Sequence, residues 1–242
     1  LIVAGATLSV FVSAALADLF WRREHLPVLV IPFLVVAAIT ALVARQLAEI
    51  TSFVGYSEFT LGWLPHGANE FLSLLGATFF TVHPAAGAIV LAVIAWRSRY
   101  LALLAVAAVL VGQLVFLGLD VKQQPLLMTW AGFNLVLTAI ALGGIYTVPG
   151  LLSFLNAMLA TALTALLLIA CQNLLFVYGL PLIALPYISV TLVFLVALRT
   201  RLSVAPPWLA VQSGMPEQNY ERARLARVRN GDINSVPLLL PV

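Results

Sequence analysis

Two proline pairs are the residues whose spacing suggests chemistry most directly. Pro27 and Pro32 stand five positions apart, and the pair recurs 154 positions later as Pro181 and Pro186. Because proline has no N–H and clashes with the preceding turn, each pair breaks a helix and leaves carbonyl groups without helical partners. Within a membrane, such backbone is tolerated only where it is buried in protein or lines a cavity. The repeated pair therefore predicts hydrogen-bond acceptors on a transport pathway between two halves of a membrane protein.

The side chains that usually carry enzymatic chemistry form no recognisable group in this sequence. Serine, histidine and aspartate are scattered, and neither a nucleophile elbow nor a phosphate-binding loop occurs. The single cysteine, Cys171, excludes an intrachain disulfide and a cysteine-rich metal site, and its apolar surroundings favour helix packing. None of the three histidines is expected to pair with a second metal ligand. We therefore expect no enzyme and no cofactor or metal.

The composition is that of a helical membrane protein. Of the 242 residues, 63% are hydrophobic and 9% are charged, whereas a soluble domain carries about 25% charged residues. The sequence therefore predicts an all-α polytopic fold in a lipid bilayer. It starts inside an apolar run with no charged segment before it, which argues against a signal peptide. We expect a fragment that lacks part of its first repeat and continues beyond Val242.

The apolar segments predict two membrane repeats. Residues 1–46 are expected to be the end of the first repeat, with helices over 1–21 and 27–44, and residues 47–68 a polar connector. Residues 69–201 are expected to be a complete second repeat. Its spanning helices are predicted over 85–96, 100–118, 126–147, 150–176 and 181–199.

The second repeat begins with an apolar stretch that is too short to span. Residues 69–82 are about 14 residues long, whereas a full span needs about 20. The stretch ends at His83 and Pro84, shortly before Gly87. A short apolar helix that ends at a Pro/Gly turn predicts a re-entrant segment, and an interfacial helix is the alternative.

Basic residues predict the orientation of the chain. If residues 69–83 are re-entrant, the arginine pairs at 22–23, 97–99 and 199–201 share one face with the tail, and the positive-inside rule makes that face cytoplasmic. The two proline pairs then run in opposite senses, as inverted repeats require. Residues 202–242 read as a basic tail or linker. Its stretch 217–229 is expected to be a solvated juxtamembrane helix near anionic headgroups. No aromatic residues interleave its arginines, which argues against nucleic-acid binding.

Three stretches, in order, resemble the urea transporter family. Residues 76–87 resemble the family's Gly-Gln/Glu…Asn-Pro…Gly stretch, residues 132–144 its Gly-Phe/Tyr-Asn segment, and residues 180–191 its Leu-Pro…Leu-Pro-Phe…Thr segment. The resemblance covers 69–200 as one repeat and 1–46 as the tail of the preceding one. It implies two inverted halves, each with five spanning helices and one re-entrant helix, around a narrow pore. It also implies a homotrimer in the bacterial inner membrane, with passive passage of urea through each protomer.

The same resemblance assigns residues to that pore. Phe133 and Leu137 match the pair that lines a flat slot for urea, Phe80 matches the aromatic residue of the re-entrant helix, and Thr191 matches the hydroxyl in the middle of the pore. Thr78 and Ala77, in the predicted re-entrant stretch, are also assigned to the lining of the pore. Pro84, Gly87 and Asn134 match structural positions, together with the four prolines of the two pairs. Ordinary helix packing is the alternative for Phe80, Phe133 and Leu137, and a hydrogen bond to its own helix is the alternative for Thr191.

Four positions depart from the family pattern. Ala77 stands where the family has Gln or Glu, His83 replaces the Asn before Pro84, and Ala86 replaces a Ser or Thr. Ala37 stands where a threonine would match Thr191. The polar side of the pore is therefore expected to rest mainly on the second proline pair, and a related small amide is an alternative to urea.

Two other functions are carried as alternatives. A flavin-carrying redox subunit would need an Asp-x-x-Ser/Thr-Gly-Ala-Thr motif, but both Gly-Ala-Thr triplets, at 5–7 and 76–78, lack the preceding residues. The other alternative is a membrane module of a fused protein, for example with a C-terminal peptidase domain. A cell-wall peptidase would need an extracytoplasmic tail, which disagrees with the orientation derived from the arginines.

Overall fold

The computed structural model describes residues 2–24, 27–47, 60–79, 81–121, 131–178, 183–200 and 215–229. Within these ranges every regular element is a helix, which confirms the predicted all-helical class. The elements are α1 (Ile2–Glu24), α2 (Ile31–Leu47), α3 (His66–Ala77), α4 (Pro84–Arg97), α5 (Arg99–Gly118), α7 (Phe133–Ile140), the π-helical segment η1 (Ala141–Ile145), α8 (Leu151–Tyr178), α9 (Leu185–Thr200) and α10 (Pro216–Arg229).

Two of these helices are long and apolar enough to cross a bilayer. They are α5, with 20 residues, and the segment Leu151–Leu175 of α8. At 1.5 Å per residue, 20 residues rise about 30 Å, which is the thickness of the hydrocarbon core. Parts of α1, α2, α4, α7 with η1, and α9 are apolar but shorter.

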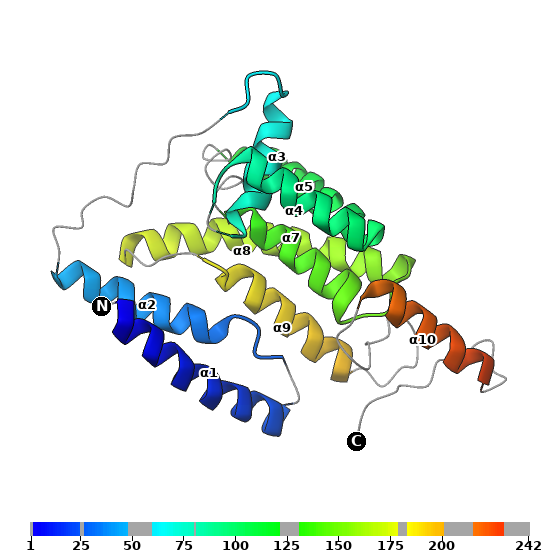
Figure 1. The fold of residues 1–242 in the computed structure, drawn as a ribbon, viewed down its shortest axis with the longest axis horizontal. Coiled ribbons are helices and arrows are strands. Elements are labelled where there is room, and N and C mark those ends of the chain that lie inside the picture. The colour runs from blue at the N-terminus through cyan, green and yellow to red at the C-terminus, as the bar shows by residue number, and fades with distance from the viewer. Residues whose placement is uncertain are drawn as a thin grey trace.

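The main core lies between α5, α7 and α8, which lie against one another in Figure 1. Leu104 and Phe116 of α5, Leu135 of α7 and Leu168 of α8 are fully buried there. Close approach of α5 and α7 depends on Gly112, because a Cβ at that position would collide with the side chain of Leu135. Cys171 is also buried in α8, as expected for a packing residue.

Helices α3 and α4 form a tight antiparallel pair around two glycines. A Cβ on Gly87 would collide with the backbone carbonyl of Leu72, and one on Gly76 would lie 2.9 Å from the carbonyl oxygen of His83. The two backbones therefore touch where these residues cross. His83 caps α4, because its Nδ1 accepts a hydrogen bond from the backbone N–H of Ala85 at 3.1 Å. Pro84 occupies the first turn, where its missing N–H costs nothing.

The turns that lie between the two prolines of each pair share their local structure. Leu29 and Ile183 are both in the left-handed region, with φ of 51° and 34°. The helices that follow begin at Ile31 and Leu185, and the first helical hydrogen bonds, Leu34 N–H to Val30 O and Ile188 N–H to Ala184 O, are both 3.0 Å long. All of these positions differ by the 154 residues that separate the prolines.

The helices before the two breaks are matched as well. α1 ends at Glu24 and α8 at Tyr178, again 154 positions apart. Thr7 donates to the carbonyl of Val3 at 3.0 Å, and Thr161 donates to the carbonyl of Ala157 at 2.8 Å, at the same offset. The pair α1–α2 and the pair α8–α9 thus contain equivalent hydrogen bonds at equivalent positions, in addition to the same proline spacing.

The end of α7 continues as a π-helix through Gly143 and Gly144. The N–H of Tyr146 bonds to the carbonyl of Ala141, five residues earlier, at 2.8 Å. Cβ atoms on Gly143 and Gly144 would lie 2.8 Å from a methyl of Leu104 and 2.6 Å from a methyl of Leu101. The two glycines therefore admit side chains of α5 while the backbone stays helical.

The expectation of a solvated helix over 217–229 is wrong for its beginning. Asn219 and Ala223 are buried, and Asn219 donates from Nδ2 to the carbonyl of Ile145 at 3.3 Å. Ser98 donates to the carboxylate of Glu217 at 2.5 Å. In Figure 1, α10 begins beside the end of α7 and then extends away from it. Its first turn is therefore docked, although few of its residues are apolar.

Replacing Gly87 with alanine should destabilise the protein. The added methyl group meets backbone atoms of α3, which cannot rotate away, and overpacking of this kind costs about 1–3 kcal/mol or more. Thermal unfolding of the purified protein in detergent, followed by circular dichroism, should show a lower midpoint for Gly87→Ala. Gly67→Ala is the matched control, because a Cβ on Gly67 meets nothing within 4 Å. Equal midpoints for the two variants would contradict the close contact.

Candidate functional site

A second apolar cluster adjoins the main core, and Tyr146 and Leu192 pack against both. Its buried members are Ala77, Phe133, Ala141, Ala184, Tyr187 and Ile188, and the partly buried residues packed against it include Leu29, Ile31, Leu34, Val82, Leu137, Tyr146, Ile183 and Leu192. These residues come from the end of α3 and the connection to α4, from α7 and η1, and from the starts of α2 and α9 with the turns that precede them. The second cluster is therefore the place where the interrupted helices of the chain meet.

Asn134 holds the second helix break together from a neighbouring helix. It is fully buried, and its Nδ2 donates to the carbonyl of Ile183 at 2.9 Å and to that of Ala131 at 2.9 Å. Its Oδ1 accepts from the N–H of Tyr187 at 3.2 Å. Tyr187 is the third residue of α9, where backbone N–H groups have no helical partner. One side chain thus satisfies a donor and an acceptor that the break sets free.

The carbonyl of Ile183 is therefore not an empty acceptor. The helix break is expected to expose carbonyl groups to a pore, but one of the two lone pairs of this carbonyl is used by Asn134. The left-handed backbone at Ile183 is unfavourable for a β-branched residue. The hydrogen bonds of Asn134 to the carbonyl of Ile183 and to the N–H of Tyr187 help to hold the residue in that conformation.

Thr191 carries an unusual buried hydroxyl. The residue is fully buried on α9, and its Oγ1 has no hydrogen-bond partner among the described residues. The alternative from the sequence, a bond back to its own helix, is not what the structure shows, whereas Thr138, Thr161 and Thr164 all make such bonds. Thr191 lies one turn after Tyr187, so it is on the same helix face as a member of the second cluster.

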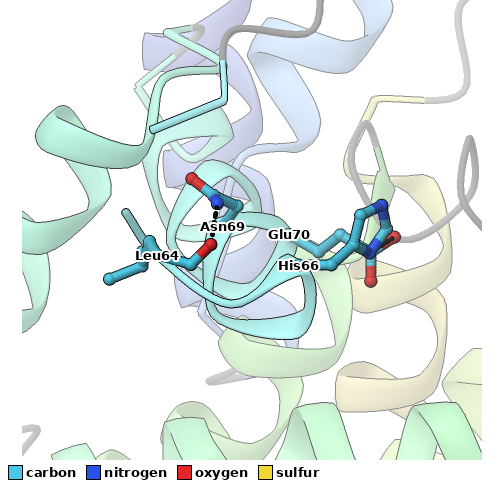
Figure 2. Close-up of polar contacts among 4 residues, drawn as sticks. All are labelled: Leu64, His66, Asn69 and Glu70. Atoms are coloured by element: carbon cyan, nitrogen blue, oxygen red, sulfur yellow. Dashed lines mark hydrogen bonds and ion pairs between the residues drawn. The ribbon is translucent and has the colours of Figure 1, made fainter. Parts of the chain in front are cut away.

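The position of α3 is fixed at its first turn. Asn69 is buried, and it accepts from the N–H of Leu61 at 2.9 Å and donates to the carbonyl of Leu64 at 2.9 Å. Figure 2 shows this bond on one side of the turn and the side chains of His66 and Glu70 on the other. The Nδ1 of His66 lies 3.4 Å from Glu70 Oε1. A histidine does therefore pair with a glutamate, contrary to expectation, but among the described residues no third metal ligand joins them.

The structure brings together three of the residues that the sequence assigned to a pore. Ala77, Phe133 and Leu137 belong to the second cluster, and Thr191 lies beside it. Thr78 ends α3 and is half-buried. Pro32 and Pro186 are buried in the first turns of α2 and α9, and Pro27 is half-buried before its turn. Phe80 and Pro181 lie outside the described residues.

Sequence reasoning missed several residues of this region. Tyr146 and Ala141 belong to the second cluster because the π-helix adds a residue to the last turn of α7, and no sequence signal marks that change. The left-handed turns at Leu29 and Ile183 were also missed, although their equal spacing within the two repeated segments could have identified a shared turn. Asn134 was singled out, but the groups that it binds were not.

Asn134→Ala should lower the thermal stability of the protein by several degrees. The change removes the side-chain hydrogen bonds to the N–H of Tyr187 and to the carbonyl of Ile183. Each buried group left unpaired lowers the free energy of unfolding by about 1–3 kcal/mol. Asn156→Ala is a matched control, because Asn156 Nδ2 has no hydrogen-bond partner among the described residues. Midpoints measured by circular dichroism in detergent should fall for Asn134→Ala and stay near wild type for the control. The reverse order would refute the role given to Asn134.

Comparison with known proteins identifies the family of the chain. No curated protein matches the chain. The model of the urea transporter family, however, matches residues 1–199, which is most of the chain and includes both proline pairs, residues 69–83 and α7. The chain is thus an integral membrane protein that belongs to the urea transporter family.

Proposed function

We propose that this chain conducts urea, or a closely related small neutral amide, along a pathway at the second cluster. The observation that carries the proposal is the convergence there of Ala77, Phe133 and Leu137 with the starts of α2 and α9 and the turns that precede them. Membership of the urea transporter family supports channel-type transport of urea in general. The residues that line the pathway and the solute itself are our inference.

The physical demands of urea suit these residues. Urea is planar and neutral, and its four N–H bonds must find acceptors as it loses water. The flat side chains and short aliphatic groups of Phe133, Leu137 and Tyr187 would form the walls of a narrow slot. Apolar walls disfavour ions, because removing a charge from water costs several kcal/mol. Thr191 would supply an acceptor at the edge of the slot, since its hydroxyl is unpaired among the described residues.

We propose that two inverted repeats form this pathway, one from each side of the membrane. The matched turns at Leu29 and Ile183, and the helices that begin 154 positions apart, support a twofold internal repeat. Re-entry of residues 69–83 is supported by the 12-residue length of α3 and by its tight packing against α4. We accordingly divide the chain at the proposed boundaries: 1–46 as the end of the first repeat, 47–68 as the connector, 69–201 as the second repeat and 202–242 as the tail.

The two breaks would contribute unequally to selectivity. Thr191 of α9 corresponds to Ala37 of α2, 154 positions earlier. The hydroxyl of Thr191 therefore has only the methyl group of Ala37 as its counterpart in the first repeat. Ala77 lies in the second cluster, where the family resemblance implies Gln or Glu. The polar contacts with the solute would therefore come mainly from the second repeat. We further propose a homotrimer in the bacterial inner membrane with the basic tail in the cytoplasm.

Thr191→Val should slow urea entry into proteoliposomes that contain the full-length protein. The substitution keeps the shape of the side chain and removes the hydroxyl, and the loss of one hydrogen bond of about 1 kcal/mol corresponds to a roughly fivefold slower step. Stopped-flow light scattering under a urea gradient measures the rate.

Thr161→Val is the matched control for this experiment, because the Thr161 hydroxyl is used within its own helix. It should conduct urea at the wild-type rate. If wild-type vesicles take up urea no faster than empty ones, the proposed function is wrong. If Thr161→Val and Thr191→Val slow entry equally, the special role of Thr191 is wrong.

A further inference from the structure

A groove of about 320 Å³ lies beside the docked start of α10, away from the second cluster. One wall is the turn between α4 and α5, with Trp96, Arg97 and Arg99. Met215 and Glu217, at the start of α10, belong to the other wall. The groove therefore exists only where the tail helix meets the membrane helices.

The groove has more positive than negative charge. Arg97 and Arg99 are exposed, and among the described residues no carboxylate lies within ion-pair distance of either guanidinium group. Glu217 is the acidic group in the groove, and its carboxylate accepts a hydrogen bond from Ser98 at 2.5 Å. Arg222 and Arg224 are exposed further along α10. Arginine offers a planar, permanently charged fork of donors that fits a phosphate group.

An apolar stripe on α4 leads to this groove. Ile89, Val93 and Trp96 are 67%, 63% and 94% exposed. Their spacing of four and three residues places them on one face of the helix. In a membrane protein such a face meets lipid tails, and a tryptophan at its end is typical of the level of the headgroups. The stripe and Arg97 thus follow one another along α4, and Arg99 begins α5 directly after the turn, in the order that tail and headgroup have in a phospholipid.

We propose that this groove binds the headgroup of an anionic phospholipid. Its phosphate would lie at Arg97 and Arg99, and an acyl chain would lie along Val93 and Ile89. A free phosphate ion would use the arginines but leave the adjoining apolar stripe uncovered, so a lipid fits the whole surface better. Because the walls of the groove belong to both the α4–α5 turn and α10, a bound headgroup also bridges the tail helix and the membrane helices. This inference rests on the membrane location of the family and not on the identity of the solute.

The test uses bromine-labelled lipids, which quench nearby tryptophan fluorescence. The full-length protein is reconstituted into vesicles in which either phosphatidylglycerol or phosphatidylcholine, at equal mole fraction, carries brominated acyl chains. The signal of Trp96 is obtained as the difference between the wild type and Trp96→Phe. We expect the phosphatidylglycerol label to quench Trp96 more strongly. Replacing either arginine with glutamine should reduce the preference about fivefold, the factor that corresponds to ~1 kcal/mol per arginine at an anionic surface.

The matched control removes the same charge from outside the groove. Arg224→Gln should retain most of the preference for phosphatidylglycerol, whereas Arg97→Gln with Arg99→Gln should abolish it. All variants are exposed substitutions, and circular dichroism checks that they fold. The proposal is overturned if the two labels quench Trp96 equally in the wild type, or if Arg224→Gln reduces the preference as much as the groove variants do. It is also overturned if neither label reaches Trp96, which is the result expected when a second copy of the chain covers the stripe.

Discussion

The cost of leaving backbone polar groups unpaired in apolar surroundings governs the central region of this protein. A proline pair interrupts the chain before α2 and again before α9, and each interruption frees donors and acceptors that the helix would otherwise use. At the second break, Asn134 pairs with both the N–H of Tyr187 and the carbonyl of Ile183. Because Asn134 is on α7, the break is fixed relative to the helix that also carries Phe133 and Leu137. The same contact that stabilises the break therefore positions the residues proposed to line the solute pathway.

Close approach of backbones is the second condition for this arrangement. Gly76 and Gly87 let the backbones of α3 and α4 touch. This contact fixes the position of the end of α3, where Ala77 belongs to the second cluster. Gly143 and Gly144 allow α5 side chains against the π-helical end of α7. On the other side of that end, Asn219 of α10 binds the carbonyl of Ile145. Glycines thus allow the close packing of α3 against α4 and of α5 against the end of α7.

Much of the fold could be predicted from apolar length and from the repeat. The predicted helices over 100–118 and 150–176 agree with α5 and α8 within one or two residues, because an uninterrupted apolar run in lipid has no alternative to a helix. The helix predicted over 181–199 begins later, at Leu185, because Ile183 and Ala184 form a turn before it. The convergence of Ala77, Phe133 and Leu137 followed from the family resemblance, since periodicity alone fits ordinary packing equally well.

The details that the sequence did not reveal depend on contacts between distant residues. Asn134 binds groups 49 and 53 positions later, and Ser98 binds Glu217, 119 positions later. The docked face of α10 was hidden because Pro216, Asn219 and Ala223 are not a hydrophobic pattern. Ile183 has a backbone conformation that its own preference opposes, so only its surroundings can select it.

The central claim is that a water-accessible solute pathway passes Leu137 within the second cluster. Cys171 is the single cysteine, so Cys171→Ala gives a background in which Leu137→Cys is the only thiol. The rate of its modification by a small neutral thiol reagent, measured by mass spectrometry in vesicles, tests the claim directly. The account predicts that Leu137→Cys reacts and that urea slows the reaction, whereas Leu104→Cys in the main core does not react. A thiol at position 137 that is as unreactive as the one at 104, or a rate that urea leaves unchanged, would contradict it.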